Sequence, residues 1–314
     1  MKKENQLTDK LLMIRPAAFG HNTETADTNA FQKAGILEEH SVIHQQALKE
    51  FDILLEVIRN AGIQVLVYDD SRQPVKPDAV FPNNWITTHA DGSLITFPML
   101  APSRRTERRE DIIQDLATKF NVHHRYSFET YEQEGLILEG TGSMVLDRVN
   151  HIVYACLSPR THIELLEKFA LLKQYRKVVF HATDPLGHAV YHSNVILAMG
   201  RQCAVICLDC IDDEEEKDLI LSVFQATHKK VVDLQWEQIL EFAGNMLQVV
   251  TKDGRPVWLM SEAARRSLTD PQKLILEEDG IIISSPIPTI EKYGGGSVRC
   301  MLAELFLPDK KKGT

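Results

Sequence analysis

The 314-residue sequence contains no hydrophobic run as long as the roughly 18 residues that a membrane-spanning helix requires. Its first ten residues, MKKENQLTDK, are polar apart from Met1 and Leu7 and show no apolar core of a secretory signal. Basic residues are not in excess, because the formal net charge is −9, and this argues against general binding to nucleic-acid phosphates. We therefore expect a cytoplasmic protein with neither a membrane nor a nucleic-acid partner.

Cysteine is scarce, with five residues in a chain large enough to build its own core, so a disulfide framework is not expected. Cys203, Cys207 and Cys210 have the C-x-x-x-C-x-x-C spacing of iron–sulfur ligands. They lie, however, in CAVICLDC, a run of mostly aliphatic residues that is typical of a buried strand. We interpret them as core residues and expect neither a metal nor another cofactor.

The sequence does contain a repeated plan. A small polar cluster is followed by a hydrophobic run, turn residues and a second hydrophobic run, the pattern of a β-hairpin. Four clusters precede a complete hairpin, and a fifth precedes MLAELFL, the last apolar run of the chain. The clusters are centred at positions 84, 143, 194, 245 and 300, with separations of 59, 51, 51 and 55 residues. Such near-even spacing indicates a repeat architecture.

A helical pattern and a short β-rich run follow each complete hairpin, with the helices expected at 104–120, 161–175, 214–227 and 262–276. The N-terminal segment supplies a strand at 11–14, a helix at 42–60 and a strand at 65–68. These are the pieces that the fifth unit lacks. We predict one α/β domain over residues 1–314, a ring of five strand–strand–helix–strand units in which the chain ends share a unit. Periodicity alone also leaves an ordinary α+β sheet protein open.

In such a ring the polar clusters occupy equivalent places and point together at the central axis. They would bring an acid, an imidazole, two carboxamides and a thiol to one pocket. The residues are Glu139, His192, Asn84, Asn194 and Cys300.

The cluster sequences resemble a known family. GGGSVRCM at 294–301 resembles the Gly-rich cysteine loop of the guanidino-group-modifying enzymes, which include arginine deiminase, dimethylargininase and the amidinotransferases. LEGTGS at 138–143 is similar to that family's Glu-Gly-Gly strand start, and HSN at 192–194 resembles its His-x-Asp. With RPAAF and FPNNW, these motifs are most similar to the branch described as citrulline-utilisation hydrolases. The resemblance runs nearly end to end and implies a five-bladed α/β propeller, the pentein fold.

The side chains in these motifs suit a covalent hydrolysis. Cys300 as thiolate would attack the guanidinium or ureido carbon, a weak electrophile. His192 would give a proton to the departing amine and then activate water, and an imidazolium beside the sulfur would favour the thiolate. Glu139 would accept hydrogen bonds from substrate N–H groups. Cys300, His192 and Glu139 are therefore the predicted catalytic residues.

Further residues are predicted to bind the substrate. Phe81 stands where the deiminases carry a ring stacked over the planar group, and Asp78 is placed to contact the α-ammonium group. Arginine-processing members usually have Asp where Asn84 and Asn194 stand here. Carboxamides remove negative charge and offer both a donor and an acceptor, which suits a neutral ureido group.

The family's arginine before the glycines, which grips the substrate carboxylate in the deiminases, has no counterpart at Gly294 or Gly295. Its candidate substitutes are Arg15, Arg160 and Arg299, and we include Arg299 among the predicted substrate-binding residues.

We predict a cysteine-dependent hydrolase of ureido or guanidino amino acids, with a citrulline-like compound as the preferred small-molecule substrate. Two alternatives stay open. An amidinotransferase would pass the same intermediate to an amine, and a non-catalytic propeller would act as a binding module. The sequence also leaves a homo-oligomer open.

Overall fold

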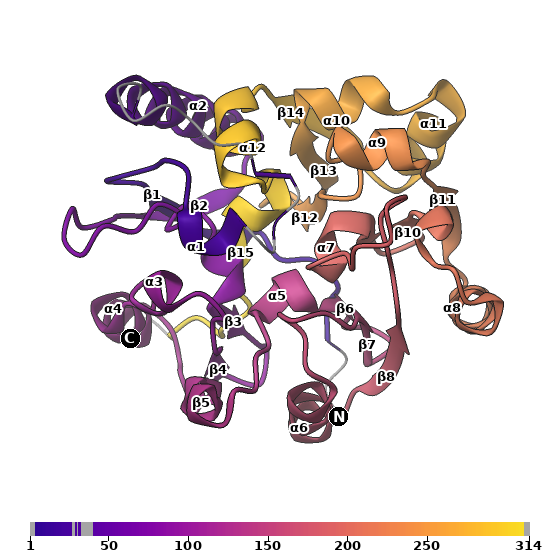
Figure 1. The fold of residues 1–314 in the computed structure, drawn as a ribbon, viewed down its shortest axis with the longest axis horizontal. Helices are drawn as coiled ribbons and strands as arrows, with labels where there is room; N and C mark the ends of the chain where they lie inside the picture. Colours follow the sequence, from indigo (N-terminus) through magenta and orange to yellow (C-terminus); the bar gives the residue numbers. More distant parts are fainter. Residues whose placement is uncertain (1–3, 27–28, 30, 33–39, 311–314) are drawn as a thin grey trace.

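The computed structural model describes residues 4–26, 29, 31–32 and 40–310, so both extremities of the predicted 1–314 domain lie outside the described residues. The described strands form five three-stranded sheets arranged around a common axis (Figure 1). In spatial order the sheets are β15 (Ala303–Glu304), β1 (Lys10–Arg15) and β2 (Gln64–Asp69); β3 (Ile86–Thr88), β4 (Ser93–Thr96) and β5 (His124–Ser127); β6 (Val145–Asp147), β7 (Ile152–Cys156) and β8 (Arg176–Phe180); β9 (Leu197–Met199), β10 (Cys203–Ile206) and β11 (Lys230–Asp233); and β12 (Leu247–Val250), β13 (Pro256–Ser261) and β14 (Ile281–Ser285).

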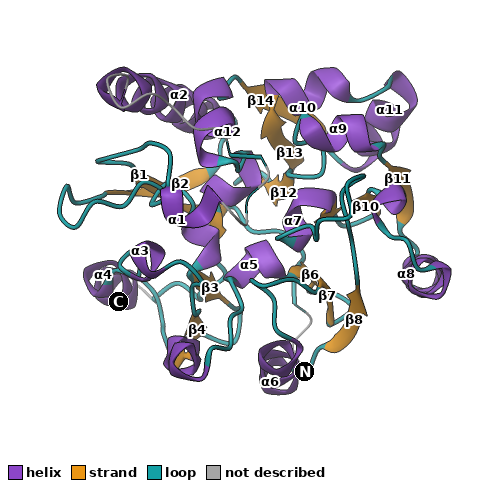
Figure 2. Cartoon of the chain, in the orientation of Figure 1, coloured by secondary structure: helices purple, strands orange, loops and turns teal. Residues whose placement is uncertain are grey.

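Every sheet has the same topology. Its middle strand pairs antiparallel with the inner strand and parallel with the outer one. A helix connects the two parallel strands, as a parallel crossover requires. These helices lie at the periphery (Figure 2), and they are α2 (His40–Asn60), α4 (Glu110–Lys119), α6 (Ile163–Lys173), α8 (Glu214–Ala226) and α11 (Asp270–Asp279). The predicted five-bladed α/β propeller is confirmed.

The two ends of the chain complete one blade together. β15 pairs antiparallel with β1, with Leu11 opposite Glu304, and β1 pairs parallel with β2. The expected sharing of one unit by the N- and C-terminal segments is therefore confirmed. Because the strands from the two ends are hydrogen-bonded to each other, the ring closes without an incomplete sheet at the junction.

Two of the expected helices are each divided into two. The pattern at 262–276 forms α10 (Glu262–Ser267) and α11, because Thr269 caps a new helix by accepting from the Gln272 amide and Pro271 occupies the first turn. The pattern at 104–120 forms α3 (Pro102–Arg105) and α4. The bend between them buries Arg104 and Glu107, which a continuous surface helix would expose.

Apolar packing between the sheets and the peripheral helices forms the core. On α2, Ile43, Ala47, Phe51, Leu54 and Ile58 follow helical spacing and are all buried. Each large side chain among them contributes about 1.5–3 kcal/mol to folding by its removal from water. None of the helices within the described ranges is long and apolar enough to cross a membrane.

Five short turns precede the inner strands and carry the polar clusters. Four are single helical turns, and the fifth is an irregular turn at residues 242–246. The helical ones are η2 (Pro82–Asn84), α5 (Gly140–Ser143), α7 (Ser193–Ile196) and η5 (Val298–Met301), and Figure 1 shows α5 and α7 near the middle of the ring. The remaining short helices are α1 (Thr23–Ala26), η3 (Phe128–Glu134), η4 (Leu208–Cys210), α9 (Trp236–Leu240) and α12 (Pro288–Gly294).

Candidate active site

One small pocket near the axis is lined by Asp78, Phe81, Asn84, His192 and Cys300. These residues come from three different turns and from positions up to 222 apart in the chain (78 and 300). Phe81 and His192 each immediately precede a helical turn, η2 and α7, so equivalent places in different blades deliver them to the same site. Of the five residues expected to meet at the axis, Asn84, His192 and Cys300 line this pocket.

The glycines before Cys300 allow the chain to pass close to other groups. Gly295 has φ +62°, in the left-handed region that favours glycine. A Cβ atom at Gly294 would lie 2.8 Å from the Phe81 ring. The glycine loop therefore packs directly against Phe81, and Cys300 follows in η5 with only 4% of its surface exposed.

The sulfur of Cys300 has two carboxamide neighbours. Asn245 Nδ2 donates to Cys300 Sγ at 3.2 Å, and Asn194 Nδ2 donates to it at 3.6 Å. Asn194 thus contacts the predicted nucleophile itself. We did not assign Asn245 from the sequence, although it belongs to the fourth polar cluster, and that position was the signal that could have found it.

His192 is bonded to Glu139. Its Nε2 lies 2.8 Å from Glu139 Oε2, and both residues are buried. Burial lowers the pKa of His192 to about 4, although Glu139 acts in the opposite direction. The resting imidazole is therefore neutral, in contrast to the imidazolium expected from the sequence.

Glu139 already has protein partners on both oxygens. Oε1 accepts from the Leu100 amide at 2.9 Å, and Oε2 also lies 3.6 Å from Arg160 Nη1. Burial raises the pKa of Glu139, but Arg160, His192 and Arg104 outweigh it and the net shift is downward. The carboxylate lies behind His192 and not on the pocket wall, where direct contact with substrate was expected.

Arg104 lies among the acidic residues around the pocket, and the sequence did not predict it as a site residue. It donates to both oxygens of Glu107 at 2.9 Å and to Asn84 Oδ1 at 3.0 Å, and its Nε lies 3.8 Å from Asp78 Oδ2. Burial opposes the charge, yet these carboxylates raise the pKa of Arg104, so it stays protonated. In the sequence it stands in RRTERRE, which resembles a solvated helix face and gave no signal.

Two polar atoms at the pocket have no hydrogen-bond partner among the described residues. They are Asp78 Oδ1, an acceptor, and Asn84 Nδ2, a donor. Burial raises the pKa of Asp78, although Arg104 and Asn22 counteract it. Because buried polar atoms are rarely left unpaired, both atoms are candidates for contact with a ligand.

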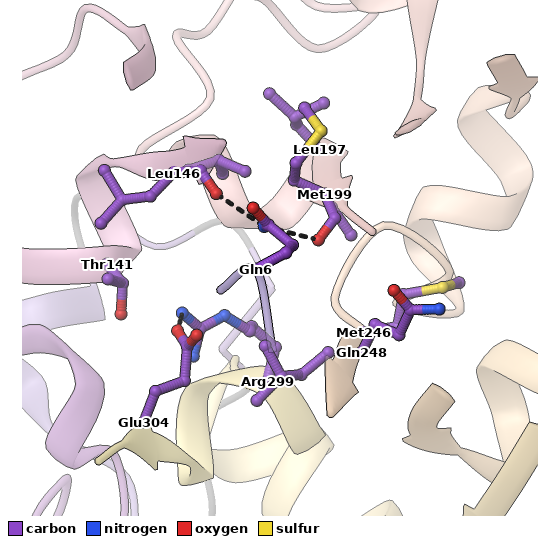
Figure 3. Close-up of a pocket in the computed structure, with 12 residues that line it drawn as sticks. Gln6, Thr141, Leu146, Leu197, Met199, Met246, Gln248, Arg299 and Glu304 are labelled. Carbon is purple, nitrogen blue, oxygen red and sulfur yellow. Dashed lines mark hydrogen bonds and ion pairs between the residues drawn. The ribbon is translucent and has the colours of Figure 1, made fainter. Parts of the chain in front are cut away.

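Arg299 does not reach this pocket. It lines a second small cavity with Gln6, Thr141 and Gln248, and Figure 3 shows it directed toward Glu304, which it contacts at 2.9 Å. Arg15 is also elsewhere, bonded to exposed Asp52. Of the three arginines considered for the substrate carboxylate, the structure places Arg160 in the pocket wall.

The low pKa of His192 predicts a pH-dependent stability. Between pH 6.5 and about 4 the unfolded chain takes up a proton at this residue that the folded chain does not, so stability is lost as the pH falls. We expect the free energy of unfolding of His192→Gln, measured by urea denaturation, to fall less steeply over this range than that of the wild type. The raised pKa values of Glu107 and Glu291, both about 7, act in the opposite direction in both proteins. Identical slopes in the two proteins would contradict a buried neutral imidazole.

The five-sheet architecture, together with a family match over most of the chain, places the protein among the guanidino-group-modifying enzymes of the pentein fold. A family model described as "N,N dimethylarginine dimethylhydrolase, eukaryotic" matches residues 15–307. The chain therefore belongs to the dimethylarginine dimethylhydrolase family.

Solved structures support the fold. A complex of an AgrE variant with L-arginine has a TM-score of 0.74 at 15% identity, covering 96% of this chain and 41% of AgrE, so this chain spans well under half of that protein. The N-terminal domain of ArgZ, bound covalently to a reaction intermediate, has a TM-score of 0.72 at 15% identity, covering 95% of this chain and 99% of that domain. ArgZ is described as an arginine dihydrolase from cyanobacteria.

A dimethylarginine dimethylaminohydrolase adduct with S-methyl-L-thiocitrulline has a TM-score of 0.64 at 14% identity, covering 95% of this chain and 99% of that chain. No curated protein matches the sequence. At these identities the structural likeness shows the fold alone.

Proposed function

We propose that this protein hydrolyses the C–N bond of a ureido amino acid, with citrulline preferred over arginine, through a covalent intermediate on Cys300. The observation that carries the proposal is the shared pocket of Cys300 and His192, with Asn84 Nδ2 buried there as an unpaired donor. A thiol and an imidazole together supply a nucleophile and a proton carrier. An unpaired donor matches the oxygen of a ureido group better than any atom of a guanidinium, which presents only N–H groups.

The reaction divides into two steps. Neutral His192 accepts the proton of the Cys300 thiol, and the sulfur forms a bond to the ureido carbon. The bond from that carbon to the side-chain nitrogen then breaks, and the nitrogen leaves as an amine with the proton from His192. This leaves a carbamoyl group on sulfur, which water attacks with His192 as base to give carbamic acid, which decomposes to ammonia and carbon dioxide.

Glu139 acts in this scheme by orienting His192 and stabilising the imidazolium that forms transiently. Because Glu139 is bonded to Nε2 of His192, Nδ1 is the ring nitrogen that remains for proton transfer. Gly142 leaves space for Nδ1, since a Cβ atom at residue 142 would lie only 2.7 Å from it. A buried carboxylate beside a transient cation stabilises it strongly, since little water screens the pair.

The ends of the substrate also have complementary groups. Asp78 Oδ1 is available to accept from the α-ammonium group, and Arg160, one of two arginines that line the pocket, would bind the α-carboxylate. Phe81, held against the glycine loop, offers a flat apolar surface to the planar ureido group.

A substrate panel tests the proposal. Purified protein is incubated with citrulline, arginine and dimethylarginine, each with and without an added amine acceptor, and the amine, ammonia and carbon dioxide are measured. We expect equal amounts of all three products from citrulline, independent of the acceptor. A product that requires the acceptor would indicate an amidinotransferase, preference for arginine or dimethylarginine would reject the ureido assignment, and no turnover would favour a binding module.

A further inference from the structure

Asn245 occupies the fourth polar cluster, and the proposed reaction gives it no role. It is fully buried in the turn that precedes β12. Phe242 in this turn has φ +60°, and its carbonyl accepts from the Asn245 amide at 2.9 Å. A Cβ at Gly244 would lie 2.2 Å from the Val195 carbonyl oxygen, so the turn is in close contact with α7. The backbone of Asn245 is therefore fixed against the turn that carries Asn194.

The carboxamide of Asn245 contacts Cys300 at two points. Its Oδ1 accepts from the Cys300 backbone amide at 3.4 Å, while Nδ2 donates to the sulfur at 3.2 Å. Nδ2 also donates to the Asn194 carbonyl at 2.9 Å. These bonds together fix the orientation of the carboxamide, because a flipped amide would bring two donors together at the Cys300 amide.

The electrostatic consequence concerns the protonation state of the sulfur. A thiolate accepts N–H hydrogen bonds more strongly than a neutral thiol does, so donors on the sulfur favour the charged form. Within the described part of the chain, Asn194 and Asn245 are the side chains that donate to Cys300 Sγ. Arg299, its buried neighbour in η5, and Tyr191 interact with Cys300 electrostatically, while the Arg299 guanidinium is hydrogen-bonded to Glu304. The neighbouring imidazole is paired with Glu139 instead.

We propose that Asn245 is a positioning residue that holds Cys300 by two hydrogen bonds, one at its backbone amide and one at its sulfur, and, with Asn194, stabilises its thiolate through carboxamide donors. This inference rests on the proposed function, since it assigns a role to the group beside the proposed nucleophile.

Alkylation kinetics test the inference without substrate. The rate at which iodoacetamide modifies Cys300 is measured between pH 5 and 10 by mass spectrometry of the peptide that contains it. Asn245→Asp keeps the size of the side chain and the acceptor for the Cys300 amide, but replaces the donor with a carboxylate. We expect its rate profile to move to higher pH, with a rate at pH 7 about tenfold lower and the same plateau at high pH. Asn60→Asp, an exposed substitution, is the matched control and should leave the profile unchanged.

A second variant covers the case in which Asn245→Asp folds poorly. Asn194→Ala removes the longer of the two bonds, and its profile should move in the same direction by a smaller amount. If both variants fold by circular dichroism and neither profile moves, the inference is wrong. A displaced profile in a protein that turns over no panel compound would support the inference while contradicting the proposed function. Normal turnover with unmoved profiles would support the proposed function and contradict the inference.

Discussion

Replacing Cys300 with serine should reduce citrulline turnover by at least about 10³-fold, because a neutral hydroxyl has far lower nucleophilicity than a thiolate. The fold should survive, since the substitution changes one atom in a turn held by its own backbone bonds. Turnover is measured by ammonia release at saturating substrate, and the unfolding midpoint is measured in parallel.

The matched control is Cys203→Ala in strand β10. Cys203 is also buried but lies outside the pocket, and burial raises the pKa of its thiol well above the usual range, so it is unreactive. The control should lose some stability through the missing sulfur and retain its turnover number. Substantial turnover by Cys300→Ser would exclude the covalent route.

The second large effect is expected from Asn84→Asp. Asn84 Oδ1 accepts from Arg104, so an aspartate keeps this bond while its other oxygen replaces the unpaired Nδ2 donor. Citrulline would then face an acceptor where its own oxygen needs a donor, and kcat/KM should fall about 10²-fold or more. The ratio of arginine to citrulline turnover should rise, because a guanidinium offers N–H groups to the new carboxylate.

This experiment separates the charge argument from the rest of the mechanism. Both kcat/KM values are measured for the wild type, for Asn84→Asp and for Asn60→Asp as the exposed control. An unchanged citrulline to arginine ratio in Asn84→Asp would show that Asn84 does not select the substrate, even where Cys300 is confirmed as the nucleophile.

The repeat made much of the fold predictable. Each blade begins with a polar cluster, and the hairpin, helix and outer strand follow at similar distances, so periodicity favoured the ring while leaving an ordinary α+β sheet protein open. The same periodicity predicted that β1 would be completed by β15. Helix boundaries could be predicted less well from the sequence. The break at Thr269 depends on a helix cap, and the break around Glu107 depends on a buried ion pair.

The sequence predicted which residues form the site better than it predicted the contacts between them. Cys300, His192 and Asn84 were expected in the pocket, and the structure places them there. Arg104 was missed because the sequence around a buried arginine with three acidic neighbours does not differ from that around an arginine exposed to solvent. Arg299 was misplaced because adjacent residues in η5 face opposite sides, one toward the pocket and one toward Glu304.

The charge state of His192 was also hidden from the sequence. Its motif suggested an imidazolium, whereas complete burial holds the pKa at about 4. The balance between desolvation and the bond to Glu139 depends on how far each group is removed from water, and spacing along the chain does not encode this.

The central claim is that Cys300 bonds covalently to the carbon of the planar group. Its most direct test is an acid quench during citrulline turnover, followed by peptide mass spectrometry. The account predicts a carbamoyl group on the peptide that contains Cys300, present during turnover and absent once citrulline is consumed. Active turnover with this peptide unmodified at every quench time, under conditions in which a synthetic S-carbamoyl peptide survives the work-up, would contradict it.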